Sequence, residues 1–435
     1  MTRRQKSLLG AALGGFILAA ALPATAQSTS NTVATPRATP RATPSMLEMW
    51  KILQAQQAKI DTLETELAEA QVETVAVKKN VESVADAVEG GVGQIGSGGS
   101  FLGSDTQIGG YGELHYEGGA KDQIDFHRFV LFFGHDFTDN IRFFSELEVE
   151  HAISGEGKVG EVELEQAYVE MDIGESTQVY GGVHLVPVGI INETHEPPTF
   201  FGVERNAVEK NIIPATWWEG GIGVSGNVGS SGFSYDAMIS SGLNLNAGNG
   251  YKIRSGRQKV GKAKFKSQAY SGRLQYTGLP GVTLASSLFY QPDVTQKAGD
   301  SITGDDVSAL LWTSNLQAEY NGFGLNALYA AWSLDGDDVD ASGRDKQNGF
   351  YIEPSYTLDM PMGSLEAAKI GVFYRYSDWD NNNGLDNNTG TRRNVFGVNY
   401  WPIDDVVLKM DYIIEDKENS TTNAKSMNLG IGYQF

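Results

Sequence analysis

The sequence predicts an all-β fold: a sixteen-stranded antiparallel transmembrane β-barrel, preceded by a periplasmic coiled-coil helix. Three observations predict this arrangement. Apolar residues alternate with polar ones between Gln107 and Phe435, as in strands that turn one face to lipid. Tight turns follow every second strand, whereas the other connections are mostly long and polar. A seven-residue apolar repeat between Met46 and Glu89 is typical of a coiled coil.

Composition excludes several classes of protein. The chain of 435 residues carries 54 acidic and 33 basic side chains, a formal net charge of −21. Such an acidic surface repels nucleic acid, so no nucleic-acid partner is expected. The absence of cysteine excludes disulfides, thiolate metal sites and cysteine nucleophiles. With 52 glycines and 20% charged residues, the chain suits strands and turns rather than a bundle of apolar membrane helices.

Residues 1–26 are expected to form a secretory signal peptide. Basic residues at positions 3, 4 and 6 precede an apolar run from Leu8 to Leu22, and Ala24-Thr25-Ala26 fits the small-residue rule for cleavage. A single-span membrane anchor is the alternative. An apolar run of about 15 residues is, however, shorter than the roughly 20 that a spanning helix needs.

The next three segments lead to the barrel. Residues 27–45 form a Pro- and Thr-rich linker with too little apolar surface to fold. Residues 46–89 form the coiled coil, in which polar Gln56 and Thr74 on the seam would fix the register at a cost in stability. A lone amphipathic helix is the alternative, but the length of the repeat favours self-association. Residues 90–106 are a Gly-rich hinge, and residues 107–435 form the barrel.

The barrel region divides into roughly sixteen alternating segments, spaced by about twenty residues on average, which suits ten-residue strands and their connections. They are expected to begin near Gln107, Asp125, Ile141, Glu161, Thr177, Glu219, Gly232, Ser267, Gly281, Ser308, Phe323, Asn348, Glu366, Arg392, Asp405 and Lys425. An irregular phase between Leu164 and Ala167 indicates a bulge or a misplaced boundary. The parity of the tight turns places both barrel termini on the short-turn side.

A soluble β-sandwich or β-helix is the alternative for this region, but its outward faces would be polar. Here the apolar faces often end in aromatic rings, such as Tyr290, Tyr320 and Phe435, which are typical of membrane interfaces. A closed barrel also satisfies every backbone hydrogen bond, as hydrocarbon requires. The predicted location is the bacterial outer membrane, with lipid and lipopolysaccharide as partners and the coiled coil in the periplasm.

Four stretches carry a family resemblance: Ala167-Tyr168-Val169-Glu170, Val186-Pro187-Val188-Gly189, the run from Ile213 to Gly221, and Gly256-Arg257-Gln258-Lys259-Val260. The chain resembles trimeric general porins broadly and the phosphate-selective porin O and P family more specifically, over about Gln107 to Phe435. The resemblance implies a sixteen-stranded barrel that assembles as a homotrimer. It also implies an arginine ladder, with lysines at the constriction. The function implied is a water-filled channel for passive diffusion of small hydrophilic solutes, anionic or neutral.

Selectivity in such a channel depends on inward-folded loops and rings of charge, so charged residues of two long outer connections and of the polar strand faces are the candidates. The third outer connection offers Glu193, Glu204, Arg205 and Lys210; the fourth offers Lys252, Arg254, Arg257, Lys259 and Lys262; the strand faces offer Arg128, Arg142, Arg273 and Arg375. Basic residues without acids between them would attract phosphate-like anions. A solvated outer loop, or a clamp for the phosphates of lipopolysaccharide, explains the basic run equally well. Acidic Glu113, Glu146 and Glu148 oppose the strand arginines.

The last strand is expected to carry the signal for assembly. It alternates up to Tyr433 and Phe435, and a terminal aromatic residue resembles the signal that the barrel-assembly machinery reads. Partnership with that machinery is therefore expected.

Catalysis and cofactors are not expected. The six histidines show no metal-binding spacing, and no nucleophile motif has partners in place, so no metal site is expected either. Two alternatives to a diffusion channel remain: a structural anchor that links a plugged barrel to the periplasm through the coiled coil, and an outer-membrane enzyme. Conductance would distinguish the anchor from a channel.

Overall fold

The computed structural model describes residues 105–435 apart from 120, 156, 298–305 and 386–388. The expected signal peptide, linker, coiled coil and most of the hinge lie outside the described residues. Among the residues that are described, no helix has the length and apolar character to cross a membrane.

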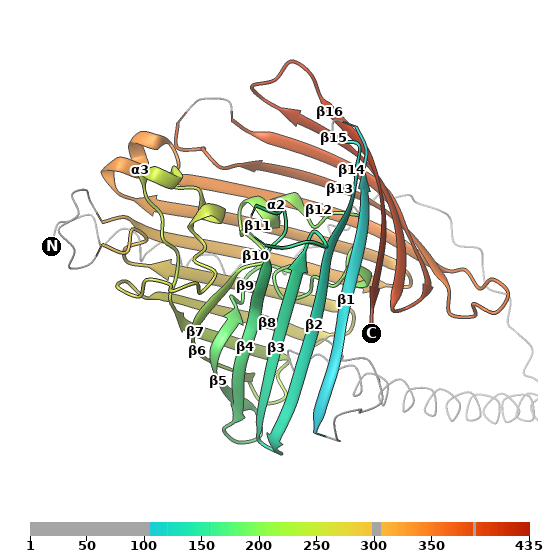
Figure 1. Cartoon of the computed structure of the whole chain (residues 1–435), viewed down its shortest axis with the longest axis horizontal. Helices are drawn as coiled ribbons and strands as arrows, with labels where there is room; N and C mark the ends of the chain where they lie inside the picture. The colour runs from blue at the N-terminus through green and yellow to red at the C-terminus, as the bar shows by residue number, and fades with distance from the viewer. Residues whose placement is uncertain (1–104, 120, 156, 298–305, 386–388) are drawn as a thin grey trace, which may run out of the picture. The chain divides into compact units, whose positions relative to one another are not determined.

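Sixteen antiparallel strands close into a barrel, in which β1 pairs with both β2 and β16. Figure 1 shows the closure, with β1 (cyan) beside the last strand (red). The strands are β1 (Thr106–Glu117), β2 (Gln123–Thr138), β3 (Ile141–Glu150), β4 (Val162–Asp172), β5 (Thr177–Leu185), β6 (Trp218–Asn227), β7 (Phe233–Ser240), β8 (Ala269–Leu279), β9 (Val282–Gln291), β10 (Ser308–Tyr320), β11 (Phe323–Asp335), β12 (Lys346–Asp359), β13 (Lys369–Asp380), β14 (Thr391–Ile403), β15 (Val406–Lys417) and β16 (Ala424–Gln434). Short helices interrupt three connections: η1 (Pro197–Thr199), α2 (Ala207–Asn211), η2 (Ala247–Asn249), η3 (Ile253–Gly256) and α3 (Asp337–Ser342).

The predicted barrel is confirmed, and every predicted strand start lies within three residues of the observed one. The rhythm of the connections also holds. The tight turn Asn321-Gly322 joins β10 to β11 with positive φ at both residues, a conformation that Gly and Asn adopt most readily. Two connections soften the rule: residues 118–122 are short although they follow an odd strand, and residues 360–368 are longer although they follow an even one.

Alternation along each strand separates a lipid face from an inner face. On β9, Leu284, Leu288 and Tyr290 are exposed large apolar side chains, whereas Ala285 and Phe289 between them are buried in the interior. A belt of outward apolar side chains is what hydrocarbon requires of a barrel wall.

The irregular phase near Leu164 is a bulge. β3 pairs with β4 in regular order until Glu146 opposite Gln166, and the next pair is Leu147 opposite Leu164, which leaves Glu165 without a partner in the ladder. The extra residue turns the Glu165 side chain into the interior, where it is 1% exposed. The predicted irregularity is thus confirmed, and it places a carboxylate inside the barrel.

The last residue closes the seam. The backbone N–H of Gly110 donates to the carbonyl of Phe435, and the N–H of Phe435 donates to the carbonyl of Gly110, both at 2.9 Å. Tyr433 lies opposite Gly112 in the same pair of strands. Phe435 therefore adds the last pair of backbone hydrogen bonds to the β1–β16 ladder, at the end of β16.

Deletion of Phe435 is expected to slow barrel closure and to destabilise the folded barrel by about 1–3 kcal/mol, because two backbone hydrogen bonds are lost. The fraction of heat-modifiable, folded protein on unheated gels during refolding into micelles would measure this. The variant F435Y keeps both the backbone bonds and an aromatic ring and serves as the control. Refolding of the truncated chain at the full-length rate would contradict the assignment.

Candidate functional site

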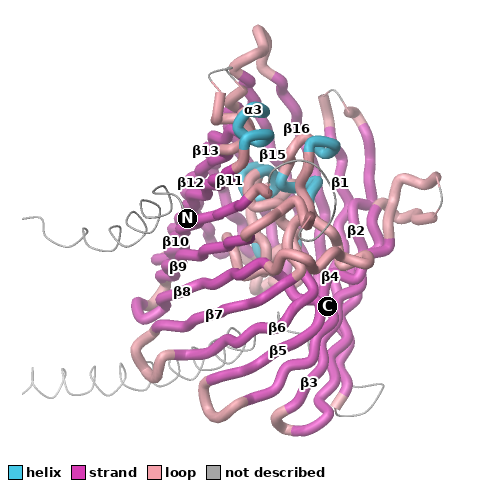
Figure 2. Tube along the Cα trace, turned by 90° about the vertical axis from the view of Figure 1, so that its left-hand side faces the viewer, coloured by secondary structure: helices cyan, strands magenta, loops and turns pink. Residues whose placement is uncertain are grey.

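Residues 186–217, which connect β5 to β6 and are called the inner loop here, lie inside the barrel. The loop is rich in apolar residues, and Val186, Val188, Ile212 and Ile213 have no exposed surface. They share one buried cluster with the wall residue Phe289 and others of β9 to β13. Figure 2 shows loops (pink) and short helices (cyan) surrounded by the strands (magenta). Burial of this apolar surface explains why the loop folds inward rather than into solvent.

Two polar side chains hold the base of the inner loop. The Asn192 amide donates to the carbonyls of Val186 and Trp217 and accepts from the N–H of Trp217, at 2.7–3.0 Å. Because these residues come from the two ends of the loop, Asn192 ties the ends together. It is fully buried, so every one of these bonds replaces a lost bond to water.

Glu209 on α2 is the second of these side chains. One carboxylate oxygen accepts from the N–H groups of Ile190 and Ile191 at 2.8 and 2.7 Å, and the other accepts from the Tyr351 hydroxyl of β12 at 2.8 Å. Burial raises the pKa of Glu209, although these hydrogen bonds act in the opposite direction. Glu209 therefore links the two halves of the inner loop to the barrel wall.

The middle of the inner loop is bound to the wall formed by β13 to β15. The N–H of Val203 donates to Asp411 at 2.7 Å, and the Arg375 guanidinium donates to the carbonyl of Phe201 at 2.6 Å. The N–H of Gly202 donates to the Asn399 side chain at 3.3 Å. The loop thus leaves the wall at β5, reaches the far side of the lumen, and returns to β6. A segment with this course narrows any path through the barrel.

The four candidate arginines of the strands face inward, but each lies against carboxylates. Arg128 pairs with Glu113 and Glu148, Arg142 with Glu170 and Asp172, Arg273 with Glu193, and Arg375 with Glu353. Their charges are therefore largely neutralised. The arginine ladder that the resemblance implies stays an expectation; in the described structure, acidic residues of the strands or of the inner loop lie beside each of these four arginines.

The basic run between β7 and β8, residues 241–268, is called the basic loop here. Its candidate residues lie in different places. Arg254 donates to the carbonyl of Ala215 at 2.7 Å, and Arg257 donates to the carbonyl of Thr216. Both arginines therefore reach the inner loop. Lys259 instead pairs with Glu161 and Glu163, and Lys252 and Lys262 are exposed.

Arg205 completes a basic group with Arg254 and Arg257. Arg205 is 9% exposed, and its Nη1 donates a long bond of 3.4 Å to the Thr216 hydroxyl. Its Nε and Nη2 have no hydrogen-bond partner among the described residues. Burial, followed by the nearby charges of Arg257 and Arg205, lowers the pKa of Arg254 to about 10. Arg254 therefore remains cationic at neutral pH. Lys210 lies close by, 48% exposed and 3.8 Å from Glu204.

An acidic group faces this basic one. His195 of the inner loop lies 3.4 Å from Glu146 and 3.6 Å from Glu165, the buried bulge residue of β4. Burial and Arg205 would lower the pKa of His195, but hydrogen bonds to the two carboxylates raise it to about 9. The inner loop is therefore held to β3 and β4 by charge as well as by packing.

Sequence reasoning missed Glu209, His195 and Glu165 as organising residues. A signal existed for one of them, because the phase break at Leu164 marked a residue displaced from its regular face. Nothing local marks Glu209 or His195, since their partners lie on strands distant in sequence.

Comparison with known proteins identifies the kind of barrel. The phosphate-selective porin O and P family matches residues 109–435. An uncharacterised protein of Aquifex aeolicus (strain VF5) is 32% identical over 346 residues, which cover 73% of this chain and 77% of that protein.

Several solved barrels are similar in fold. OmpF of Salmonella typhi in complex with daunomycin has a TM-score of 0.51 at 14% identity, covering 76% of this chain and 97% of its own. An anion-selective porin from Comamonas acidovorans has a TM-score of 0.50 at 12% identity, with coverage of 76% and 99%. The outer membrane channel DcaP of Acinetobacter baumannii also has a TM-score of 0.50 at 12% identity, with coverage of 77% and 99%. At these identities the likeness concerns the barrel fold alone.

Proposed function

The chain belongs to the phosphate-selective porin O and P family, and we propose that it forms a trimeric outer-membrane channel through which small hydrophilic solutes diffuse, with a preference for anions such as phosphate. The family and the closed barrel support a channel rather than an enzyme. The anion preference rests on the group formed by Arg205, Arg254 and Arg257, where the inner loop meets the basic loop.

One observation carries the anion preference: the buried Arg205 guanidinium keeps two donor nitrogens without a hydrogen-bond partner among the described residues. Arginine presents a planar fork that fits phosphate and carboxylate oxygens. Arg254 and Arg257 donate to backbone carbonyls, which accept hydrogen bonds but carry no negative charge to neutralise the guanidinium groups. The carboxylates of Glu163, Glu165, Glu150 and Glu219 lie within electrostatic range of Arg257. Among the described residues, none of them lies close enough to form an ion pair with it. An anion would therefore find partially unsatisfied cationic donors at this point.

The net charge of −21 works in the other direction and would favour cations. Charges on outer loops are screened within about 8 Å at physiological salt, however, whereas charges in a narrow, partly desolvated passage are screened much less. Local residues should therefore determine selectivity.

Measurement of reversal potential in a chloride gradient across a planar bilayer tests the proposal. The wild-type channel is expected to prefer anions, and R254A/R257A should lower the anion-to-cation permeability ratio severalfold without closing the channel. The variant K252A/K262A removes the same charge from exposed positions of the same loop and should change the ratio little. Cation preference in the wild type, or equal shifts in both variants, would refute the assignment.

The trimer is supported by the apolar heptads of residues 46–89 and by what the family resemblance implies. Planar-bilayer recordings also test the trimer. If three channels insert together as one unit, the current should fall in three equal steps as they close. Closure in one step per insertion would contradict it. A chain that inserts fully yet never conducts would instead favour the structural anchor.

A further inference from the structure

Three of the six histidines lie together on the lumen face of the wall, near the end of the barrel that carries the long connections. His115 comes from β1, His127 from β2, and His151 from the residue after β3. The rings of His115 and His127 stack with centroids 4.8 Å apart, and the ring of His151 meets His127 edge-on at 5.6 Å. Sequence spacing did not indicate this group, because barrel pairing alone brings the strands together.

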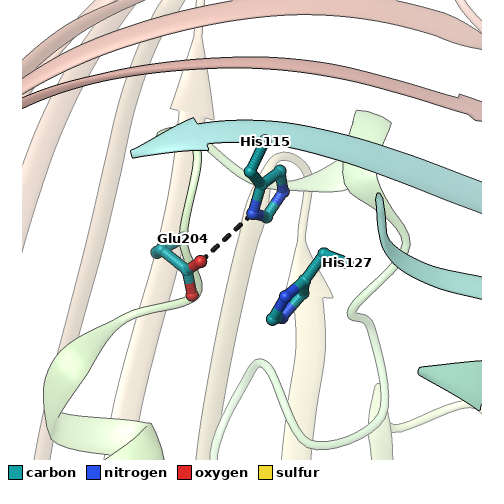
Figure 3. Close-up of side chains that lie close together, drawn as sticks. All are labelled: His115, His127 and Glu204. Atoms are coloured by element: carbon teal, nitrogen blue, oxygen red, sulfur yellow. Dashed lines mark hydrogen bonds and ion pairs between the residues drawn. The ribbon is translucent and has the colours of Figure 1, made fainter. Parts of the chain in front are cut away.

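The inner loop adds a carboxylate to this group. Glu204 lies 3.1 Å from Nδ1 of His115, as the dashed line in Figure 3 shows, with the His127 ring stacked below. One ligand-type atom from each of His115, His127 and Glu204 lies within 4.8 Å of the others. Around a tetrahedral zinc ion, bonds of about 2.0–2.1 Å place ligand atoms roughly 3.4 Å apart, so small side-chain rotations would bring the three atoms to coordination distance.

Each imidazole has its other ring nitrogen held by a carboxylate. Glu113 lies 3.1 Å from Nε2 of His115, and the Arg128 guanidinium fixes Glu113 in turn at 2.7 Å. Asp125 lies 3.1 Å from Nδ1 of His127, which leaves Nε2 of His127 for a ligand. Carboxylates in this position orient metal-binding histidines and select their tautomer. A group assembled only for ion pairing would not need to leave one nitrogen of His127 without a carboxylate.

We propose that His115 Nδ1, His127 Nε2 and the Glu204 carboxylate form a binding site for a divalent transition-metal ion of the zinc class. Two imidazoles and one carboxylate are ligands that suit zinc, copper and nickel better than magnesium or calcium. The side chains of His127 and Glu204 are 18% and 21% exposed, so an ion can reach them and a solvent molecule can complete the coordination. The inference does not depend on the proposed anion preference.

Occupancy would add a cross-link between the inner loop and the wall. Glu204 lies between the anchor at Val203 and the helix α2, whereas both histidines belong to the first two strands. A bound ion would therefore tie the loop to β1 and β2, across the β1–β16 seam from its contacts with β13 to β15. Zinc should accordingly reduce fluctuations of the open-channel current.

The test uses the full mature chain, refolded into detergent free of lipopolysaccharide, because that lipid binds divalent cations itself. Zinc titration by calorimetry is expected to give one site per chain, and cobalt should give the visible absorption of a low-symmetry site. The variant E204Q keeps the size of the side chain but removes the anionic ligand, and H127A removes an imidazole. Both should weaken zinc binding at least about tenfold. E196Q makes the same chemical change elsewhere in the inner loop, and H135Q alters a histidine at the opposite end of β2; both controls should bind as wild type.

Heat-modifiable migration of each variant establishes that the barrel has folded. Equal binding by E204Q, H127A and the two controls would overturn the proposal, as would displacement of zinc by magnesium at comparable concentration. Asp125, His127 and His151 form a second possible set of ligands. Loss of binding in H151A with retention in H115Q would overturn the assignment to His115 and Glu204.

Discussion

Replacement of Glu209 by alanine is expected to release the inner loop and to raise single-channel conductance severalfold. In the native barrel this carboxylate accepts from Ile190, Ile191 and Tyr351. Alanine would leave three buried donors without an acceptor, at a cost of about 1–3 kcal/mol for each group. The loop can recover those hydrogen bonds only by moving into water, away from its place across the lumen. Conductance in planar bilayers measures the result directly.

Two variants separate this reason from a general loss of packing. In E209Q the side-chain oxygen can still accept from the loop N–H groups, while its amide can donate to the Tyr351 hydroxyl, so conductance should stay close to the wild-type value. Y351F removes a single hydrogen bond and should destabilise the packed inner loop by only about 1 kcal/mol. Its conductance should therefore rise less than that of E209A. If E209A conducts like the wild type, the carboxylate does not hold the constriction.

The fold could be predicted from the sequence because successive side chains of a membrane-barrel strand face lipid and interior in turn, and their polarity alternates accordingly. On β9, lipid contacts every second side chain and the interior contacts the others, so the alternation of Leu284 and Leu288 with Ala285 and Ser287 states the geometry directly. The same logic located the bulge, since the extra residue Glu165 breaks the alternation.

The site could be predicted only in part. Charged side chains on polar strand faces were recognisable, and so were the acids that oppose Arg128. The contacts of the inner loop with the wall were not recognisable. Glu209 and Tyr351, for example, are 142 residues apart and meet only after the barrel closes and the loop folds inward. One sequence carries no local mark of such a contact. For the same reason, His115, His127 and Glu204 gave no spacing that indicates a metal site.

The stability of the inner loop is expected to fall as the pH rises through about 9, in part because His195 loses its proton. The ring lies against Glu146 and Glu165, its centroid is 6.0 Å from that of the Tyr111 ring, and Arg205 is the nearby cation. The carboxylates raise its pKa from the ordinary 6.5 to about 9. The stabilisation is therefore fully present below pH 6.5 and is lost as the pH rises through 9. A difference of this size corresponds to about 3 kcal/mol.

Open-channel current noise and thermal unfolding, each recorded from pH 7 to pH 10, would reveal the transition. In the wild type, noise should increase and the unfolding temperature should fall over this range, since neutral His195 leaves Glu146 and Glu165 without the cation that contacts them most closely. H195Q cannot titrate and should lack this part of the pH dependence. H184Q provides the matched control, because His184 stacks on Tyr180 and hydrogen-bonds a backbone carbonyl; it should behave as the wild type does. A transition of unchanged size in H195Q would show that another group controls the loop. Its loss in H195Q alone would assign the anchor to this histidine, because the two variants make the same chemical change at two positions inside one barrel.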